Sequence, residues 1–366
     1  MNEIDVEALR AWLETDRPLL VLDVRPAAER EEWAIPGSVH IDAYDELKKR
    51  NPHALDAVVP PNDVPVVTVC GAGRVSQIAA EFLQARGIET YSLVGGMRAW
   101  SLAWNTAELS VPESSAQIVQ IRRVGKGCLS YMIGSMDQAA MIDAALQPDV
   151  YLDLAQRHGW KITAVLDTHI HADHLSRSRL LAERSGATLY LPAQKRVAYP
   201  FTALDDGATI EIGEALLSTL RTPGHTLEST CYLLDQQALF SGDTLFLQGV
   251  GRPDLHASAE QARAQARLLY GSLQRISALP GQTLVFPGHT SLPTPFDKKL
   301  LSAHLADIRD QVKLLHLSES DFVETLLTRL PPLPPNHRQI TELNEAGLLP
   351  ENLVELEAGA NRCAIS

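Results

Sequence analysis

The chain has 366 residues, of which 45% are hydrophobic, and carries a formal net charge of −13 at pH 7. Because a single hydrophobic core is usually smaller than this, the length predicts two domains. The acidic balance gives no basic surface for nucleic acid, and no apolar run approaches the ~18 residues that would span a membrane. No basic segment followed by an apolar one opens the chain, so we expect no secretory signal and a cytoplasmic protein.

Helix-like and strand-like segments alternate through the first third of the chain. Residues 6–13 have helical spacing, whereas residues 19–24, 66–70 and 88–93 are apolar runs typical of buried strands. Such alternation predicts a small parallel sheet flanked by helices, and therefore an α/β domain.

Cys70 ends the second of these strands and begins the glycine-rich loop of residues 70–75. A helical pattern follows at residues 76–85. The thiol should therefore lie at a helix N-terminus, where backbone N–H groups and the helix dipole favour an anionic sulfur. Arg74 adds a positive charge nearby. A thiolate here could carry sulfane sulfur by nucleophilic attack, and the alternative interpretation is a buried, inert cysteine.

Three segments around this loop carry recognisable motifs. They are Asp23-Val24-Arg25, Ile35-Pro36-Gly37-Ser38 and Val94-Gly95-Gly96-Met97-Arg98-Ala99-Trp100. Together with the loop they resemble a rhodanese domain over about residues 1–107, which implies thiosulfate sulfurtransferase activity with Cys70 and Arg74 as catalytic residues. The related Cys-x5-Arg phosphatases do not fit, because Ser76 stands where their arginine is required. Gly71 stands where rhodanese loops often carry a basic residue, so a silent docking or sulfur-sensing module is the alternative.

After residue 104 the periodicity is lost, and the polar segment that follows contains Pro112. This composition indicates an interdomain linker, which we place at residues 108–116, between a first domain of residues 1–107 and a second of residues 117–366. The second domain is again expected to be α/β. Its strand-like segments are residues 118–124, 129–133, 162–166, 188–191, 216–220 and 283–286.

Seven side chains able to bind a metal follow strand-like segments of the second domain. They are His169, His171, Asp173, His174, His225, Asp243 and His289. Because strand ends can converge on one site, this density predicts a bound divalent metal. The alternative is an unrelated set of solvated or capping side chains.

The spacing His-x-His-x-Asp-His, followed by Pro-Gly-His, Gly-Asp and a late Gly-His, resembles the metallo-β-lactamase superfamily from about Gln117 onward. This resemblance implies an αββα sandwich of two sheets flanked by helices. Within the superfamily, residues 168–174, 242–246 and 249–254 look most like persulfide dioxygenases, with the glyoxalase II thioesterases as the close relatives to exclude.

The resemblance assigns roles to individual residues. In the dioxygenases one Fe(II) is held by the residues that match His169, His225 and Asp243, and Arg252 matches a residue near the carboxylates of the thiol substrate. In the thioesterases all seven candidates hold two Zn2+ ions. The remaining four, His171, Asp173, His174 and His289, would orient the iron ligands in the first case and complete a second metal site in the second case.

Two imidazoles and one carboxylate on one face of Fe(II) leave adjacent positions open, which suits a persulfide and O2. We therefore expect one Fe(II) per chain and oxidation of a small thiol persulfide, glutathione persulfide first, to sulfite and thiol. The first domain would move sulfane sulfur between thiosulfate, sulfite and thiols. The alternative is a two-zinc thioesterase fused to a rhodanese.

Residues 296–366 have a helical pattern broken by residues 331–335, Pro-Pro-Leu-Pro-Pro. This tail is expected to cover the metal site or to mediate formation of a homodimer. The four cysteines have no paired spacing, so neither disulfides nor a Cys-x-x-Cys motif is expected. Cys128 and Cys231 lie in apolar segments and are expected in the core, whereas Cys363 is expected to be exposed.

Overall fold

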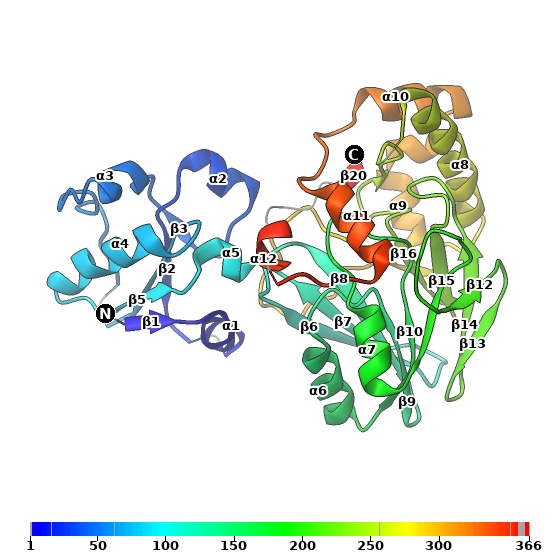
Figure 1. Cartoon of the computed structure of the whole chain (residues 1–366), viewed down its shortest axis with the longest axis horizontal. Coiled ribbons are helices and arrows are strands. Elements are labelled where there is room, and N and C mark those ends of the chain that lie inside the picture. The colour runs from blue at the N-terminus through cyan, green and yellow to red at the C-terminus, as the bar shows by residue number, and fades with distance from the viewer. Residues whose placement is uncertain are drawn as a thin grey trace.

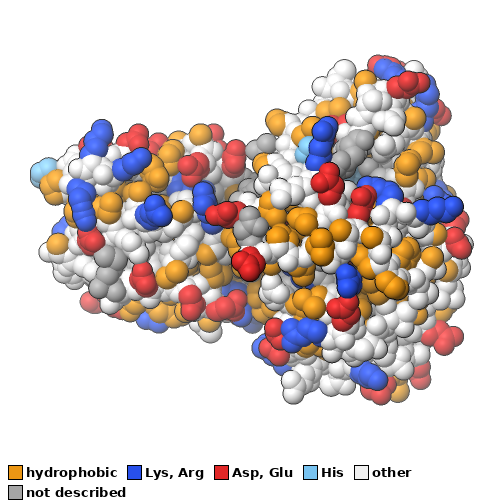
Figure 2. All heavy atoms as spheres, in the orientation of Figure 1, with side chains coloured by type: hydrophobic (Ala, Val, Ile, Leu, Met, Phe, Trp, Pro, Cys, Tyr) orange, Lys and Arg blue, Asp and Glu red, His pale blue; other side chains and the backbone are white. Residues whose placement is uncertain are grey.

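The computed structural model of the chain describes residues 2–15, 17–61, 63–255, 257–351, 353–357 and 363–365. Figure 1 shows the N-terminal part, in blue and cyan, beside a larger part that contains the rest of the chain. On the face shown in Figure 2, basic and acidic side chains are interspersed over both parts. Among the described residues, no helix combines the length and the apolar character needed to cross a bilayer.

The N-terminal part is built on a five-stranded sheet with the order β1-β5-β4-β2-β3, in which all neighbouring strands are parallel. Its strands are β1 (Asn2–Ile4), β2 (Leu20–Asp23), β3 (Val39–His40), β4 (Val66–Val69) and β5 (Thr90–Leu93). Its helices are α1 (Val6–Glu14), α2 (Ala27–Glu32), α3 (Tyr44–Lys48), α4 (Arg74–Ala85) and α5 (Gly96–Trp100). Apolar side chains of the strands are buried on both faces, which confirms the predicted small parallel α/β domain.

The segment expected to be a linker begins as a strand. β6 (Asn105–Ser110) pairs antiparallel with β7 (Gln117–Arg123), from Asn105 opposite Arg122 to Ser110 opposite Gln117. The expectation of a connector is therefore wrong for residues 108–110. The strand lies at the edge of its sheet and buries only alternate residues at its start, so its sequence has no continuous apolar run to announce it.

The larger part contains two mixed sheets. A seven-stranded sheet has the order β12-β11-β10-β9-β8-β7-β6, and a six-stranded sheet has the order β13-β14-β15-β16-β18-β19. Further strands of the first sheet are β8 (Cys128–Ser135), β9 (Gln138–Ile142), β10 (Lys161–Leu166), β11 (Thr188–Pro192) and β12 (Thr202–Leu204). The second sheet comprises β13 (Thr209–Ile212), β14 (Ala215–Arg221), β15 (Thr230–Leu234), β16 (Ala238–Gly242), β18 (Leu284–Pro287) and β19 (Ala303–His304).

Helices cover the outer faces of both sheets, while the inner faces share one apolar core. Tyr131 of the first sheet lies 4.9 Å from Phe240 and 5.6 Å from Phe286 of the second, measured between ring centroids. Outside the first sheet lie α6 (Pro148–His158) and α7 (Ser178–Ser185), and outside the second lie α8 (Ala259–Ser277), α9 (Leu305–Gln311) and α10 (Glu319–Thr328). This arrangement confirms the αββα sandwich.

The C-terminal region is helical, as expected, but only from Leu305 onward. Residues 296–304 form coil and β19, and Leu300 and Leu301 pack against the core between the sheets. Beyond α10 come the proline segment, α11 (His337–Ala346) and α12 (Leu353–Leu356). A two-stranded ribbon joins β17 (Val250–Gly251) to β20 (Ala364–Ile365), which brings the end of the chain beside the loop after β16.

The turn between β7 and β8 lies against the N-terminal domain. Trp33 donates its indole N–H to the carbonyl of Val124 at 3.0 Å, and Arg123 donates to the carbonyl of Ser101 at 2.7 Å. The side chain of Val124 also belongs to an apolar core cluster of the N-terminal domain. The two domains are thus joined by a packed, hydrogen-bonded contact.

Candidate metal centre and sulfur-transfer site

The seven candidate ligands of the second domain lie in loops that leave the strands at one end of the two sheets. Residues 169–174 follow β10, His225 lies between β14 and β15, Asp243 directly follows β16, and His289 follows β18. All seven are 1–3% exposed. The structure therefore brings together every side chain that the sequence singled out for metal binding.

His169, His225 and Asp243 form one compact group. The Nε2 atoms of the two imidazoles lie 4.0 Å and 3.6 Å from Asp243 Oδ2. His225 donates its Nδ1–H to the carbonyl of Arg252 at 2.8 Å, and His169 Nδ1 lies 2.9 Å from Thr168 Oγ1. These contacts hold the Nδ1 side of each ring and leave Nε2 directed at the carboxylate, the arrangement typical of metal-ligating histidines.

Two atoms of this group, His169 Nε2 and Asp243 Oδ2, are buried and have no hydrogen-bond partner. Buried polar atoms without a partner are costly, and a cation shared between them would remove that cost. Burial lowers the pKa of His169 well below its usual value, and nearby His171 lowers it further, so the ring is neutral. A neutral imidazole is the form that binds metals, and the group fits a divalent metal.

Asp143 is a buried residue of this region that the sequence reasoning missed. It accepts hydrogen bonds from the backbone N–H and the hydroxyl of Thr168 at 2.7 Å and 2.9 Å, and it lies 3.2 Å from His171 Nε2. Asp167 is part of the same acidic group. Asp143 directly follows the apolar strand β9, which is the same context that identified Asp243, so this signal was available in the sequence.

His289 connects the group of His169, His225 and Asp243 to a second group, which consists of Cys128, Asp173, His174 and His289 itself. Its Nδ1 lies 2.5 Å from Asp243 Oδ1, and its Nε2 lies 2.8 Å from Asp173 Oδ2. Burial alone would lower the pKa of His289, but the two carboxylates raise it well above its usual value. His174 Nδ1 lies 3.1 Å from Asp173 Oδ1.

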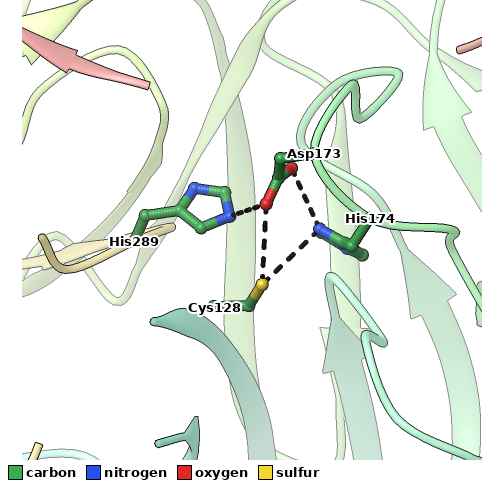
Figure 3. Close-up of side chains that lie close together, drawn as sticks. All are labelled: Cys128, Asp173, His174 and His289. Atoms are coloured by element: carbon green, nitrogen blue, oxygen red, sulfur yellow. Dashed lines mark hydrogen bonds and ion pairs between the residues drawn. The ribbon is translucent and has the colours of Figure 1, made fainter. Parts of the chain in front are cut away.

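Cys128 belongs to the second group, as Figure 3 shows: its Sγ is 3.5 Å from Asp173 Oδ2 and 3.8 Å from His174 Nδ1. Burial and Asp173 raise the pKa of this thiol, but His174 and His289 outweigh them and lower it to about 6. The thiol is buried as expected, yet it lies among candidate metal ligands and not in an apolar core. By contrast, burial raises the pKa of Cys231 to about 11.

Cys363 was expected to be exposed, and this is wrong. It is 1% exposed and lies beside Asp243 and His289, because pairing of β20 with β17 draws the end of the chain into the site. All four cysteines are free and buried.

Arg252 lies close to the group of His169, His225 and Asp243, but its side chain is buried against other residues of the protein. The guanidinium is fully buried, pairs with Asp254 at 2.7 Å, and donates to the carbonyls of Pro331 and Pro332 at 2.8 Å and 3.0 Å. Arg252 thereby ties the proline segment of the C-terminal tail to the loop whose carbonyl holds His225. Contact between Arg252 and a substrate carboxylate stays a prediction.

The helical tail covers the loop of candidate metal ligands at residues 169–174. Asn344 of α11 donates to the carbonyls of His171 and His174 at 2.8 Å and 2.9 Å. Glu357 accepts from the backbone N–H of Leu175 at 2.7 Å and is fully buried. Of the two roles expected for the tail, the structure shows coverage, while dimer formation stays a prediction.

A cavity of about 290 Å3 opens beside His289. Its walls come mainly from residues 246–249 and 290–295, with Pro287 and Leu301. This lining is largely apolar, so the cavity could receive a small molecule next to the metal group.

In the first domain, Cys70 lies where the sequence placed it, before the N-terminus of α4. It is 2% exposed, and its Sγ accepts a hydrogen bond from the Ser76 backbone N–H at 3.3 Å. Met97 N–H donates to the Cys70 carbonyl at 2.9 Å. A Cβ atom on Gly96, whose φ is +57°, would overlap that carbonyl oxygen, so the glycine pair of residues 95–96 permits this close packing.

A cavity of about 390 Å3 lies over the cysteine loop, at the boundary between the domains. It is lined by Gly71 and Ala72 of the loop, by Arg25, Glu29, Glu32, Trp33, Tyr44, Met97, Arg98 and Ser101, and by Gly125 of the β7–β8 turn. Arg25 and Arg98 are the cations of this lining. Arg74 is instead exposed on the first turn of α4, and its catalytic role stays a prediction.

Comparison with known proteins agrees with these two parts. Residues 5–103 match the rhodanese-like domain family, and residues 123–289 match the metallo-beta-lactamase superfamily. The chain therefore combines a rhodanese-like domain with a domain of metallo-β-lactamase fold, a fold that binds metals. These are the two families that the sequence motifs resemble.

Individual relatives are informative for the second domain. A hydroxyacylglutathione hydrolase from Rhizobium johnstonii is 36% identical over 153 residues, which are 41% of this chain and 56% of that protein. The chain thus spans about half the length of the curated relatives it matches. Among solved structures, ETHE1 from Myxococcus xanthus is 29% identical, with a TM-score of 0.55 over 63% of this chain and 98% of that one. A metallo-beta-lactamase from Staphylococcus aureus is 27% identical, with a TM-score of 0.59 over 66% and 74%.

Proposed function

We propose that this protein is an Fe(II) persulfide dioxygenase whose rhodanese-like domain transfers sulfane sulfur through Cys70. One observation carries the proposal: the two sites meet at a single turn. Gly125 of the β7–β8 turn lines the cavity over the Cys70 loop, and β8 begins three residues later with Cys128, beside the metal-binding residues. A sulfur-transfer cavity built partly from the metal domain supports a substrate that both domains handle, namely sulfane sulfur on a thiol.

In this proposal His169, His225 and Asp243 hold the iron. When bound, the iron would activate O2 toward the persulfide. The protein residues fix the site: the Arg252 carbonyl and Thr168 orient the two imidazoles, and Asn344 of α11 holds the loop of His171 by a hydrogen bond to its carbonyl. The balanced reaction is RSSH + O2 + H2O giving RSH, sulfite and two protons, in which the outer sulfur loses four electrons to O2.

The first domain would act by nucleophilic attack. The Cys70 thiolate attacks the outer sulfur of thiosulfate, an S–S bond forms on Cys70, and sulfite leaves with the electron pair of the broken bond. A small thiol then takes the sulfur from Cys70. The backbone N–H of Ser76 donates to the Cys70 sulfur at 3.3 Å and so holds it in place at the start of α4. The reverse direction, which drains persulfide and sulfite to thiosulfate, uses the same groups.

A binuclear zinc thioesterase fused to a rhodanese is the second candidate. Two observations favour it. Curated relatives of the second domain are hydroxyacylglutathione hydrolases. In addition, His171 Nδ1 and His174 Nε2 are buried without a hydrogen-bond partner, as expected if these side chains also bind a metal.

The first domain could also be catalytically silent. The observation that favours this is Glu29, whose Oε2 lies 3.5 Å from where a Cβ atom of Gly71 would be. A carboxylate at the position where a basic residue would attract the anionic donor weakens thiosulfate binding. Formation of cyanide-reactive sulfur on Cys70 after incubation with thiosulfate would exclude the silent module.

The first experiment measures O2 uptake and sulfite release by protein loaded anaerobically with Fe(II), using glutathione persulfide, with iron content determined on the same sample. Rapid uptake with stoichiometric sulfite supports the dioxygenase. No uptake, together with hydrolysis of S-lactoylglutathione by the zinc-loaded protein, would replace it with the thioesterase.

A further inference from the structure

The cavity beside His289 has largely uncharged walls. Apolar side chains such as Phe246, Leu247 and Leu292 form much of its lining, and other polar groups there, such as Gln248, are neutral. Among the described residues, no lysine, arginine, aspartate or glutamate lines it. We propose that this cavity binds the carrier group R of the persulfide RSSH and selects an uncharged, largely apolar R over one that bears carboxylates. The inference rests on the dioxygenase proposed above and names its substrate class.

The cavity lies next to the proposed iron site. His289, which is part of its lining, has its Nδ1 atom 2.5 Å from Asp243 Oδ1. Phe246 and Leu247 follow Asp243 by three and four residues in the same loop. An R group held against these side chains would therefore place the terminal sulfur of the persulfide near the iron ligands.

One wall of the cavity is a short closed loop. Phe246 donates its N–H to the carbonyl of Gly249 at 2.9 Å, and Leu245 forms a β-bridge with Val250. The backbone that carries Phe246 and Leu247 is therefore held at both ends of the loop.

The other main wall, residues 290–295, is also held at both ends. Thr290 donates its N–H to the carbonyl of Gly127 at 2.9 Å, and the Asn105 side chain donates to the carbonyl of Pro295 at 3.1 Å. With both walls held in this way, the cavity exists before a ligand arrives. An apolar group can then bind without the entropic cost of ordering a loop.

Arg252, the residue that the resemblance places near the substrate carboxylates, is occupied elsewhere. Its guanidinium is fully buried, pairs with Asp254, and donates to the carbonyls of Pro331 and Pro332. Turning it toward a substrate would remove this partner from Asp254 and from both carbonyls. The net charge of −13 adds a long-range repulsion of anions. Both features disfavour a carrier with carboxylates.

A carboxylate inside the cavity would be costly. Moving an ionised carboxylate out of water, against apolar walls and without a cation, is far more unfavourable than the burial of a small apolar group is favourable. The carboxylates of a larger carrier would stay outside the cavity, in water, where they add nothing to binding. An alkyl chain would instead occupy the cavity, whose volume is about 290 Å3.

Leu292 is an exposed apolar residue of this lining. Its side chain is 64% exposed. A single exposed leucine is ordinary on a protein surface. This one, however, continues the apolar lining of a cavity, so an alkyl R group would cover it and increase the buried apolar area. Leu292 is thus a residue at which a change of charge should alter the choice of carrier.

The test compares the persulfides of butane-1-thiol and 4-mercaptobutanoate, which differ in that a carboxylate replaces the terminal methyl group. With iron-loaded full-length protein, we expect kcat/KM to be at least ~10-fold higher for the butane-1-thiol persulfide, mainly through a lower KM. Binding of the two thiols to metal-free protein is measured by ligand-observed NMR. Butane-1-thiol should bind, and 4-mercaptobutanoate should bind at least ~10-fold more weakly.

Two variants test the position of the carrier. Leu292→Arg adds a cation to the lining and should shift the ratio of the two kcat/KM values toward the carboxylate at least ~10-fold, with unchanged iron content. Leu268→Arg, which adds the same charge at an exposed leucine of α8, is the matched control and should leave the ratio unchanged. An unchanged ratio in Leu292→Arg would overturn the assignment of the carrier to this cavity.

Equal kcat/KM values for the two persulfides, or a preference for the carboxylate, overturn the proposal. If a preference for the carboxylate disappears in Arg362→Gln, this arginine, which lies outside the described residues, supplies the recognising charge.

The binding measurement separates this proposal from the dioxygenase. No O2 uptake with either persulfide, together with selective binding of butane-1-thiol, removes the dioxygenase and leaves the preference of the cavity intact. Equal binding of the two thiols, together with O2 uptake, overturns the preference while the dioxygenase stands.

Discussion

His225 donates its Nδ1–H to the backbone carbonyl of Arg252 at 2.8 Å, while the buried Arg252 side chain pairs with Asp254 and holds the proline segment of the C-terminal tail. The imidazole proposed to bind the metal is thus oriented by the main chain of a residue whose side chain anchors a different part of the molecule. The geometry at the metal centre therefore depends on the packing of the tail.

This relationship predicts that Arg252→Ala weakens both the fold and metal binding. Removing the guanidinium leaves Asp254 and two carbonyls without their partner, which should lower the free energy of unfolding by about 3 kcal/mol. A displaced carbonyl should weaken metal affinity ~10–100-fold. Urea denaturation and metal titration measure the two effects. If stability and metal affinity were unchanged while KM for glutathione persulfide rose, Arg252 would instead contact the substrate, as the resemblance to persulfide dioxygenases implies.

Replacing His169 should remove the catalytic metal. His169→Ala deletes one of three ligands, so we expect iron content well below that of the parent protein and O2 uptake reduced at least ~100-fold. His304, an exposed histidine at the edge of the six-stranded sheet, provides the matched control. His304→Ala should retain the iron content and the O2 uptake of the parent protein. Iron analysis and oxygen-electrode traces check this. Normal iron content in His169→Ala would remove this residue from the ligand set.

Cys70→Ser should separate the two activities. Sulfur transfer from thiosulfate should be abolished, because a hydroxyl cannot carry sulfane sulfur, whereas persulfide oxidation at the metal should persist. The yield of thiosulfate during persulfide oxidation then shows the direction of sulfur transfer. A lower yield in Cys70→Ser than in wild type indicates that the first domain transfers sulfur from persulfide to sulfite, which forms thiosulfate. Cys231→Ser, which alters a buried thiol that is hydrogen-bonded to Thr222, is the control for sulfur transfer. Equal thiosulfate yields from wild type and Cys70→Ser would argue against transfer of sulfur from persulfide to sulfite.

Glu357 should make the fold sensitive to acid. Burial alone would raise its pKa, but Arg123 and Arg177 hold the pKa far below its usual value. A carboxyl group with a lowered pKa in the folded state stabilises the protein fully above its unfolded pKa of roughly 4.3 and loses this contribution as the pH falls further. Glu357→Gln should therefore lower the free energy of unfolding by about 3 kcal/mol at pH 7.

The same substitution should flatten the decline of stability between about pH 5 and pH 3. Unfolding by urea at several pH values measures both effects. Glu324, which forms an exposed ion pair with Arg263, supplies the comparison, and Glu324→Gln should change stability by less than about 1 kcal/mol. An equally steep acid decline in Glu357→Gln would assign the acid sensitivity to other carboxylates.

Local patterns predicted much of the fold. Apolar runs such as residues 66–69 and 162–166 became the strands β4 and β10, because a strand buried on both faces requires consecutive apolar side chains. Strand β6 was missed, since an edge strand needs fewer buried residues and its six residues resemble a loop. Residues 300–301 were assigned to a helix because they fit its spacing, yet they lie in coil and pack, partly buried, against the core between the sheets.

The two α/β domains, the glycine-rich cysteine loop, and the set of histidines and aspartates at strand ends could all be predicted from local sequence patterns. Each of these is written in a short stretch of chain, where hydrophobic spacing and turn residues act locally. Three contacts became visible only in the folded chain: Cys128 faces Asp173, the Arg252 guanidinium donates to the proline segment, and Glu357 forms an ion pair with Arg123. These contacts join segments far apart in the sequence, and they arise from the packing of whole sheets and helices, which leaves no local pattern to read.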